Sequence, residues 1–154
     1  RKEILKRMGI QTIGSDKLNQ LRTLRTLRDA ATLKKHMAEL ADILRPKFDI
    51  VLNTLESELS EGKFASWITP RGGYFVSLFV EEGCAKRTYK LLKKAGVTVT
   101  TVGATYPYGN DLRDSNIRIA PTYPADEELD IAMHVLACSV KLAAVENLID
   151  KCEE

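Results

Sequence analysis

The chain has 154 residues, of which 44% are hydrophobic and 29% are charged, an ordinary composition for a globular protein with a buried core. This length suits one domain, or one compact domain with an additional arm. The formal net charge of +2 gives no electrostatic reason to expect nucleic acid or a membrane as a partner. No apolar run approaches the roughly 20 residues that a membrane span needs, and the N-terminus has no apolar signal core.

The three cysteines are Cys84, Cys138 and Cys152, an odd number at wide spacing. They form no CxxC pair, which favours free thiols in a cytoplasmic protein. A zinc site needs clustered ligands, and His36 and His134 stand alone, so no metal site is expected. The chain opens without a methionine directly into a helical pattern, and we therefore do not expect Arg1 to be a natural start.

The first thirty residues predict two helices joined by a short loop. Residues 2–8 form the first helix, with Gly9 as its stop. Ser15 is the predicted cap of the second, which extends to about Asp29. A basic stripe on this second helix favours a solvated or subunit-facing surface over a phosphate-binding face. The stripe consists of Lys17, Arg22, Arg25 and Arg28.

The next segment predicts a single helix of about thirty residues, because apolar residues recur at spacings of three and four. Pro46 lies inside it, removes one backbone donor and predicts a kink. Gly62 is expected to end the helix. The apolar stripe consists of Leu33, Met37, Leu40, Ala41, Leu44, Phe48, Leu52, Leu55 and Leu59.

The remaining segments predict three strands and two helices. In chain order these are a strand at 73–80, a helix at 84–95, a strand at 97–102, a turn-rich loop at 103–115, a strand at 116–120 and a helix at 126–151. The expected fold is α/β, of the α+β kind. It is a three-stranded sheet on which the long kinked helix and the C-terminal helix pack.

The last helix carries two apolar rows. The first row is Leu129, Met133, Leu136, Val140 and Ala144, and the second is Ile131, Val135, Cys138, Leu142, Val145 and Ile149. A helix that is apolar on two sides is buried on two sides. One row can cover the sheet. The other needs a surface that this chain does not supply, unless the last helix forms a hairpin with the long helix.

Arg118 is the candidate site residue that the strand pattern identifies. Because side chains alternate along a strand, Ile117 and Ile119 point to one face and Arg118 to the other. A guanidinium on a rigid strand can bind a carboxylate at two points, since its parallel donors match two oxygens. Periodicity alone favours a simpler interpretation, in which Arg118 is a surface residue paired with Asp111 or Asp114. Motifs for other catalytic chemistry, such as GxSxG, a P-loop, HExxH or GxGxxG, are missing from the sequence.

Six short segments stand out along the sequence. They are TIGSDKLNQLR (12–22), LRPKF (44–48), PRGGYF (70–75), GCAKR (83–87), GATYPYG (103–109) and NIRIAP (116–121). In this order they resemble the C-terminal region of fold-type-I pyridoxal-phosphate (PLP) aminotransferases. The closest resemblance is to the type Ic bacterial aspartate aminotransferases, also described as alanine–glyoxylate-like. RTLR at 22–25 departs from that pattern, which has a histidine here.

The resemblance implies a division of labour between domains. In such enzymes a large domain holds PLP through a lysine, and the small domain closes over the substrate and supplies an arginine for its α-carboxylate. That arginine corresponds to Arg118, which favours the carboxylate interpretation. Asn19 and Gln20 correspond to a region that approaches the partner subunit's active site. Residues 1–30 would be arm or linker helices from the large-domain and dimer-interface region, and 31–154 the C-terminal small domain.

No lysine of the chain has the serine-rich context of the PLP lysine, so we expect no catalytic residue and no PLP on this chain itself. The intact protein is expected to be a PLP-dependent homodimer. It would transfer an amino group between an amino acid, aspartate or glutamate, and a 2-oxo acid, and this part alone would be inactive. Two alternatives stay open. One is a stand-alone regulatory module that binds a small carboxylate, and the other is the aminotransferase-like domain of a transcription regulator.

Overall fold

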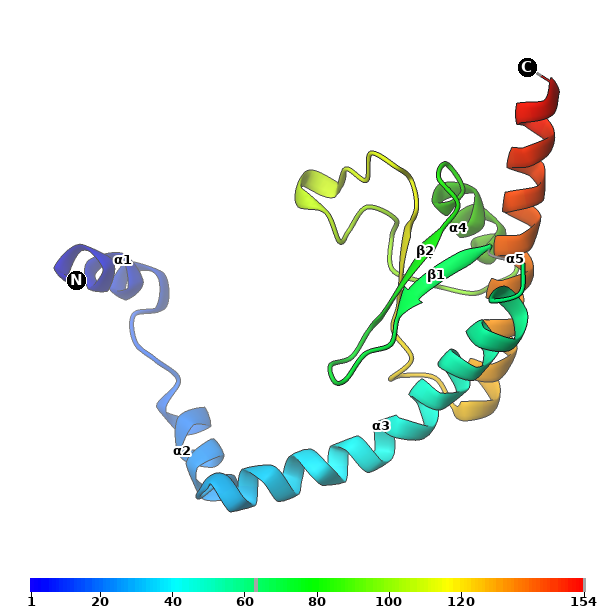
Figure 1. Ribbon diagram of the computed structural model, residues 1–154. Helices are drawn as coiled ribbons and strands as arrows, with labels where there is room; N and C mark the ends of the chain where they lie inside the picture. The colour runs from blue at the N-terminus through cyan, green and yellow to red at the C-terminus, as the bar shows by residue number, and fades with distance from the viewer. Residues whose placement is uncertain (63, 154) are drawn as a thin grey trace. The chain divides into compact units, whose positions relative to one another are not determined.

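A computed structural model describes residues 1–62 and 64–153 of the chain. The chain divides into two compact units, Arg1–Asp42 and Ile43–Glu154, and helix α3 (Ala30–Leu59) contributes to both. Figure 1 shows the N-terminal helices in blue and the sheet with its helices in green to red. None of the described helices is long and apolar enough to cross a membrane.

The first unit contains α1 (Lys2–Thr12), α2 (Lys17–Thr26) and the first turns of α3. Helix α1 continues through Gly9, where the sequence predicted a stop, because one glycine costs a helix only about 1 kcal/mol. The N-cap of α2 is Asp16 and not Ser15, since the Asp16 carboxylate accepts the Asn19 backbone N–H at 2.9 Å. Neither helix buries a residue within this chain.

Helix α3 stays helical through Pro46 and ends at Leu59, three residues before Gly62. Its C-terminal turns bury Val51, Leu55 and Leu59. Leu55 and Leu59 belong to the predicted stripe and Val51 lies next to it, whereas Leu33, Met37 and Leu40 at the start of the stripe are exposed. The periodicity therefore identified the helix, and its inner face only over the C-terminal turns. The kink at Pro46 stays a prediction.

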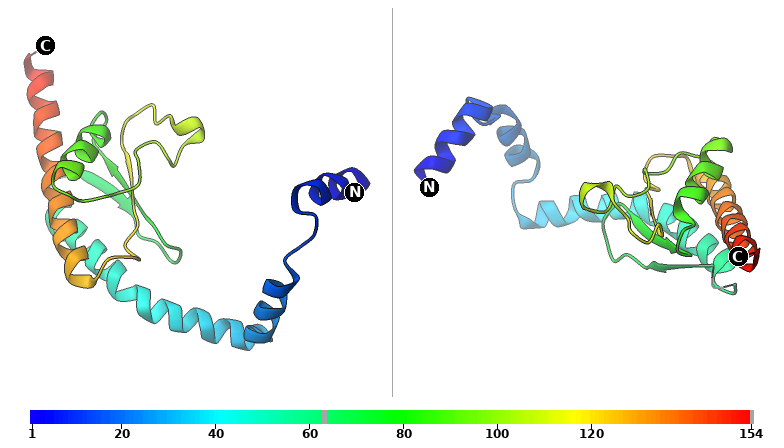
Figure 2. Two further views of the ribbon diagram at one scale, coloured as in Figure 1. Left: turned by 180° about the vertical axis from the view of Figure 1, so that it is seen from behind. Right: turned by 90° about the horizontal axis from the view of Figure 1, so that it is seen from above.

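The second unit is built on a three-stranded antiparallel sheet in the order β1-β2-β3. Its strands are β1 (Ala65–Ile68), β2 (Val76–Val80) and β3 (Asn116–Ile119). Residues on one face of β2 and β3 are buried, with Val76 opposite Ile119 and Leu78 opposite Ile117. Helix α4 (Ala85–Lys94), helix α5 (Asp126–Glu153) and the C-terminal turns of α3 pack on that face (Figures 1 and 2).

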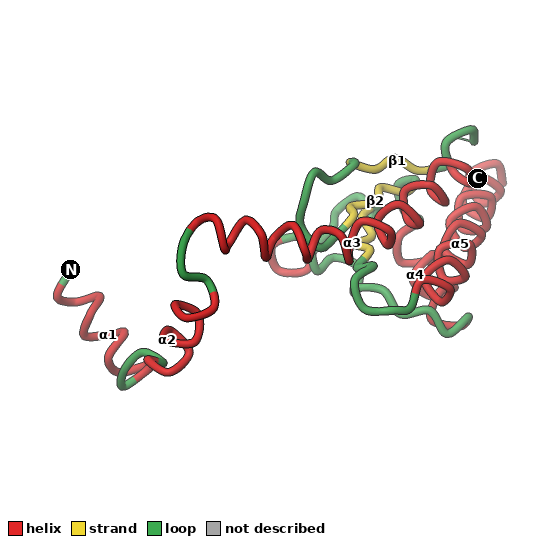
Figure 3. Tube along the Cα trace, turned by 90° about the horizontal axis from the view of Figure 1, so that it is seen from below, coloured by secondary structure: helices red, strands yellow, loops and turns green. Residues whose placement is uncertain are grey.

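One predicted strand does not form among the described residues, and one observed strand was not predicted. Residues 97–102 form no strand in the described structure, although their valines suggested one. The side chains of Val97, Val99 and Val102 pack against the core, but their backbone joins no ladder. The third strand is instead β1, a short edge strand of alternating intermediate and exposed residues that the sequence did not predict. Along the chain, two strands lie between α3 and α4 and one lies between α4 and α5. Figure 3 draws the strands in yellow and the helices in red.

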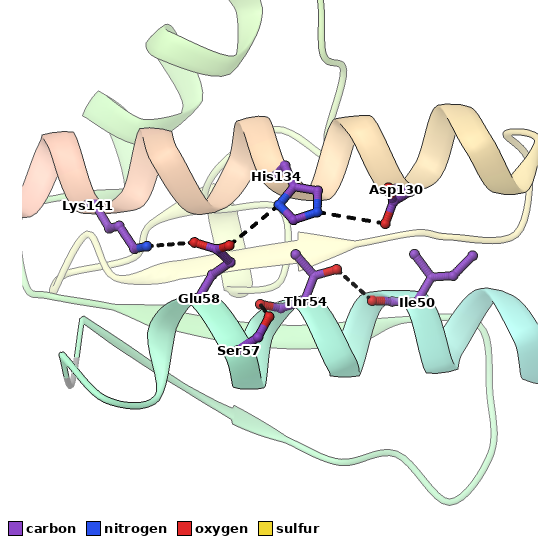
Figure 4. Close-up of polar contacts among 7 residues, drawn as sticks. All are labelled: Ile50, Thr54, Ser57, Glu58, Asp130, His134 and Lys141. Carbon is purple, nitrogen blue, oxygen red and sulfur yellow. Dashed lines mark hydrogen bonds and ion pairs between the residues drawn. The ribbon is translucent and has the colours of Figure 1, made fainter.

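Helices α3 and α5 are joined by a group of polar side chains (Figure 4). Glu58 of α3 accepts a hydrogen bond from Lys141 Nζ at 2.7 Å, and its other oxygen lies 3.6 Å from His134 Nδ1. The Lys141 ammonium lowers the pKa of Glu58 by hydrogen bonding and charge. A contact between the long helix and the last helix, which the sequence left open as an alternative, is therefore present.

That contact still leaves one side of α5 uncovered within the chain. The first apolar row is buried, with Leu136 at 1% exposure. The second row is largely open, since Ile131 is 65% and Leu142 is 45% exposed, while Val135 is partly buried. The prediction that this chain leaves the second row without a full cover is confirmed.

Candidate functional site

Arg118 lies in the middle of β3, on the sheet face opposite the helices. Ile117 and Ile119 on either side are buried in the core, and Arg118 is half-buried. Its partner in the antiparallel register is Ser77 of β2. The alternation predicted from the sequence is therefore confirmed, and a rigid strand holds the guanidinium at the open face.

Two side chains contact the guanidinium group of Arg118. Its Nε donates a hydrogen bond to Thr100 Oγ1 at 3.3 Å, and its Cζ lies 4.4 Å from the centroid of the Phe75 ring. A cation over an aromatic face is attracted by the negative charge density of the ring. Its two terminal nitrogens make no hydrogen bond to any residue in the described ranges 1–62 and 64–153. The end of the guanidinium is therefore open to an external acceptor.

The ion pair of Arg118 with Asp111 or Asp114 is not formed. The Asp111 carboxylate binds backbone N–H groups of Arg113, Ser115 and Asn116 at 3.1, 2.8 and 2.9 Å. One oxygen of Asp114 accepts the Lys86 N–H at 3.1 Å. Both acids are used in holding the loop, which removes the simpler interpretation of Arg118 as their partner.

The pKa of Asp111 reflects its structural task. Burial raises this pKa, but backbone N–H donors from Asn116, Ser115, Arg113 and Asp114 together outweigh burial, and the net pKa is lowered. A carboxylate that accepts several backbone donors is stabilised in its charged form. Asp111 therefore stays ionised and fixes the end of the loop before β3.

Asn116 ties the loop to the open face of the sheet beside Arg118. Its amide nitrogen donates to Ser77 Oγ at 2.9 Å, and its amide oxygen accepts from Thr105 Oγ1 at 2.7 Å. Thr105 belongs to the loop, which also contains a short 3-10 turn at Pro107–Gly109. The roles of Asn116 and Thr105 could not be predicted from the sequence, because hydrogen bonds between loop and sheet side chains leave no periodic signal.

Gly103 sets the course of the same loop. Its φ is +88°, and a Cβ at this position would overlap the backbone carbonyl of Gly109. A glycine is needed both for the left-handed conformation and for this close approach. The loop returns on itself here, and Thr105 is thereby brought to Asn116.

Asn19 and Gln20 lie in α2 of the first unit, and both are exposed. With Asp16, Thr23, Leu24 and Leu27 they line an open depression of about 500 Å³. The Asn19 backbone N–H binds the Asp16 cap, and its carbonyl accepts from Thr23 Oγ1. The side-chain amides of both residues point to no hydrogen-bond partner within the described residues. Their contact with a partner subunit stays a prediction.

No cluster of three or more metal-ligating side chains occurs among the described residues. Cys84 is buried, and Cys138 and Cys152 are exposed and unpaired with each other. The basic stripe of Lys17, Arg22, Arg25 and Arg28 lies on exposed positions of the first unit.

The described lysines do not fit a PLP site. All of them are exposed except Lys47 and Lys141, which are half-buried. Lys47 binds Asp126 at 3.0 Å and the Pro124 carbonyl, and Lys141 binds Glu58. A Schiff-base lysine needs a free amine inside a cofactor pocket. The part of the chain that the structure describes provides no such arrangement.

The chain is similar to known proteins over most of its length. A family model described as aspartate amino-transferase matches residues 2–152. The aspartate aminotransferase of Corynebacterium glutamicum is 45% identical over 143 residues, which cover 90% of this chain and 32% of that protein. The crystal structure of an aspartate transaminase from the same organism superposes with a TM-score of 0.89 at 43% identity, covering 96% of this chain and 35% of the other. This structural likeness confirms the expected fold class.

A second kind of relative is more distant. The HTH-type transcriptional regulator NorG of Staphylococcus aureus is 28% identical over 130 residues, covering 83% of this chain and 28% of the regulator. The chain spans about a third of the length of all three proteins.

Proposed function

Because the chain belongs to the aspartate aminotransferase family, we propose that it is the substrate-binding small domain of a PLP-dependent aminotransferase. The intact protein would transfer an amino group between an amino acid and a 2-oxo acid. The first pair to test is L-aspartate with 2-oxoglutarate, following the activity named for the Corynebacterium glutamicum relative. The observation that carries the proposal is the open guanidinium end of Arg118 on a rigid strand.

Arg118 has the chemistry for the α-carboxylate of the substrate. Its planar donors match two carboxylate oxygens, whereas a lysine ammonium is a compact point charge without this planar fork. Because Arg118 lies on strand β3, the direction from which a substrate carboxylate can approach it is fixed. A fixed direction is needed to orient the substrate for proton transfer. The neighbouring acids are held by backbone donors and do not compete for the guanidinium.

The cofactor would be held outside this chain. PLP supplies the electron sink for breaking the Cα–H bond of the amino acid. The described lysines are exposed or bound to carboxylates, and relatives of the chain are about three times its length. We therefore assign substrate capture to this chain and cofactor chemistry to a large domain, and we expect the isolated chain to be inactive. Asn19 and Gln20 would approach the active site of a second subunit in a homodimer.

The two alternatives differ in what accompanies this domain. A regulator of the NorG kind would retain the fold with a DNA-binding segment, but sequence identity to that protein is 28%, against 45% to the aspartate aminotransferase. A stand-alone carboxylate-binding module is less consistent with relatives in which the same region is about a third of the protein. An enzyme is therefore favoured.

The test uses Arg118→Lys and Arg118→Ala in the full-length protein, with Arg113→Ala as a matched control. Arg113 is a nearby arginine whose side chain is 77% exposed. Loss of the two-point carboxylate contact is expected to lower kcat/KM for L-aspartate by roughly two to four orders of magnitude. The control should stay near the parental value. Near-parental kcat/KM in both Arg118 variants, with PLP fully loaded, would refute the assignment.

A further inference from the structure

The Arg118 side chain is held from two directions before any substrate arrives. Thr100 Oγ1 accepts its Nε–H at 3.3 Å, and the Phe75 ring lies 4.4 Å from its Cζ. We propose that Thr100 and Phe75 are positioning residues, which orient the guanidinium so that its two terminal nitrogens face the substrate carboxylate. This inference rests on the proposed function of Arg118 as the carboxylate ligand.

Thr100 occupies a segment that is suited to fixing a hydrogen bond. Residues Val97 and Val99 pack against the core, while Thr100 between Val99 and the loop is half-buried and reaches Arg118. Residues 97–102 thus place a side-chain hydroxyl at the open face of the sheet, although their backbone does not pair with a strand. A carboxylate can bind a guanidinium either at the edge formed by Nε and one terminal nitrogen or at the edge formed by both terminal nitrogens. The Thr100 hydroxyl already accepts the Nε–H, so the first edge is occupied. A carboxylate is left with the end that carries both terminal nitrogens.

Phe75 restricts the guanidinium in the remaining direction. The residue directly precedes β2, is 47% exposed and does not belong to the buried core. An apolar ring at the open face contributes little to core burial, but it covers one face of the Arg118 plane and attracts the cation. The ring limits tilting of the Arg118 guanidinium, and the Thr100 hydroxyl limits its rotation. The guanidinium therefore loses less conformational freedom when a carboxylate binds.

The kinetic test uses four variants of the full-length protein in two conservative pairs. Thr100→Val removes the acceptor at nearly equal volume, and Thr100→Ser keeps it. Phe75→Leu removes the aromatic face, and Phe75→Tyr keeps it. We expect Thr100→Val to raise KM for L-aspartate roughly tenfold, and Phe75→Leu about two- to fivefold, with kcat changed less. Thr100→Ser and Phe75→Tyr should keep a KM for L-aspartate close to the parental value. A loss of folded protein would instead lower apparent kcat at unchanged KM.

A double substitution separates failure of this inference from failure of the proposed function. Adding Thr100→Val to Arg118→Ala should change kcat/KM no further, because the residue that Thr100 positions is gone. If Arg118→Ala has no effect, the proposed function fails. If Arg118→Ala is strongly impaired but the Thr100 and Phe75 variants keep parental KM, only the positioning role fails.

A second measurement needs no turnover. In the full-length protein with ¹⁵N-labelled arginine, the Arg118 Nε–H resonance should exchange with water faster in Thr100→Val than in Thr100→Ser. Its chemical shift should move in Phe75→Leu, where the ring current is lost, and stay nearly constant in Phe75→Tyr. Unchanged exchange and shift in both disruptive variants would overturn the two contacts.

Discussion

The Asp111 carboxylate accepts the backbone N–H of Asn116 at 2.9 Å, two residues before Arg118 on the same strand. The same oxygen accepts the Ser115 N–H at 2.8 Å, and the other oxygen accepts the Arg113 N–H at 3.1 Å. One buried side chain therefore fixes both the end of the loop and the start of β3. The position of Arg118, which would bind the substrate carboxylate, therefore depends on Asp111.

Asp111→Ala should destabilise the chain at neutral pH, because it leaves backbone donors without their acceptor. The expected loss in free energy of unfolding is about 1–3 kcal/mol. The stability of Asp111→Asn should lie between those of the parental chain and Asp111→Ala. Urea unfolding measures it, with Asp150→Ala at an exposed position of α5 as the control. If the alanine variant matched that control, the carboxylate would not be the anchor.

The same anchor predicts a pH dependence. The pKa of Asp111 in the folded chain is lowered from its ordinary value of 3.8. A lowered pKa means that the stabilisation is present above pH 3.8 and is lost as the pH falls through the folded value. Parental chain and Asp111→Ala should therefore converge in stability at acid pH. A constant difference between them down to pH 2 would contradict this linkage.

Helix α5 offers a matched comparison of its two apolar rows. Leu136→Ala removes a side chain that is 1% exposed and should cost about 2–5 kcal/mol through lost burial and a cavity. Leu142→Ala removes the same atoms where exposure is 45%, and should cost less than about 0.5 kcal/mol. Urea unfolding of the chain measures both. Similar losses would mean that the second row is covered in solution, and sedimentation would then show whether a second copy covers it.

Gly103→Ala tests the loop that precedes β3 and contacts Asn116. An added Cβ would overlap the Gly109 carbonyl, and the φ of +88° is unfavourable for alanine. The expected loss is about 1–3 kcal/mol. Gly72→Ala is the control, since a Cβ at Gly72 meets no atom within 4 Å. Equal thermal unfolding temperatures for the two variants would show that the close approach is not present.

Periodic patterns predicted most of the helical structure and the inner face of the sheet. The stripe ending at Leu59 and the alternation of Ile117, Arg118 and Ile119 both follow from the geometry of a single element. The strand at 97–102 was wrong because a run of valines and threonines can pack on a core without a ladder partner, and pairing is a tertiary property. Strand β1 was missed because a run of four residues is too short to give a periodic signal in the sequence.

The candidate site divides in the same way. Arg118 was identified from its strand position and from the family resemblance, and the structure confirms the strand position and its open face. Its contacts with Phe75 and Thr100 join residues 43 and 18 positions away along the chain. No local pattern encodes such a pairing. The acids nearest in sequence, Asp111 and Asp114, proved to bind backbone donors, which depend on the loop conformation.

The isolated chain is expected neither to retain PLP through a lysine nor to transaminate. The reason is the state of its described lysines, which are exposed or, for Lys47 and Lys141, bound to carboxylates. An exposed amine forms a Schiff base with PLP that water reverses, because no pocket holds the ring or the phosphate.

Incubating the purified chain with PLP and then dialysing it should therefore remove the visible absorbance of PLP, whereas the full-length protein should keep this absorbance. Borohydride reduction before dialysis, followed by peptide mapping, should find scattered labelling. A stoichiometric band that survives dialysis, mapped to one lysine and accompanied by turnover of L-aspartate, would place the cofactor site within this chain and refute the assignment of cofactor chemistry to a separate domain.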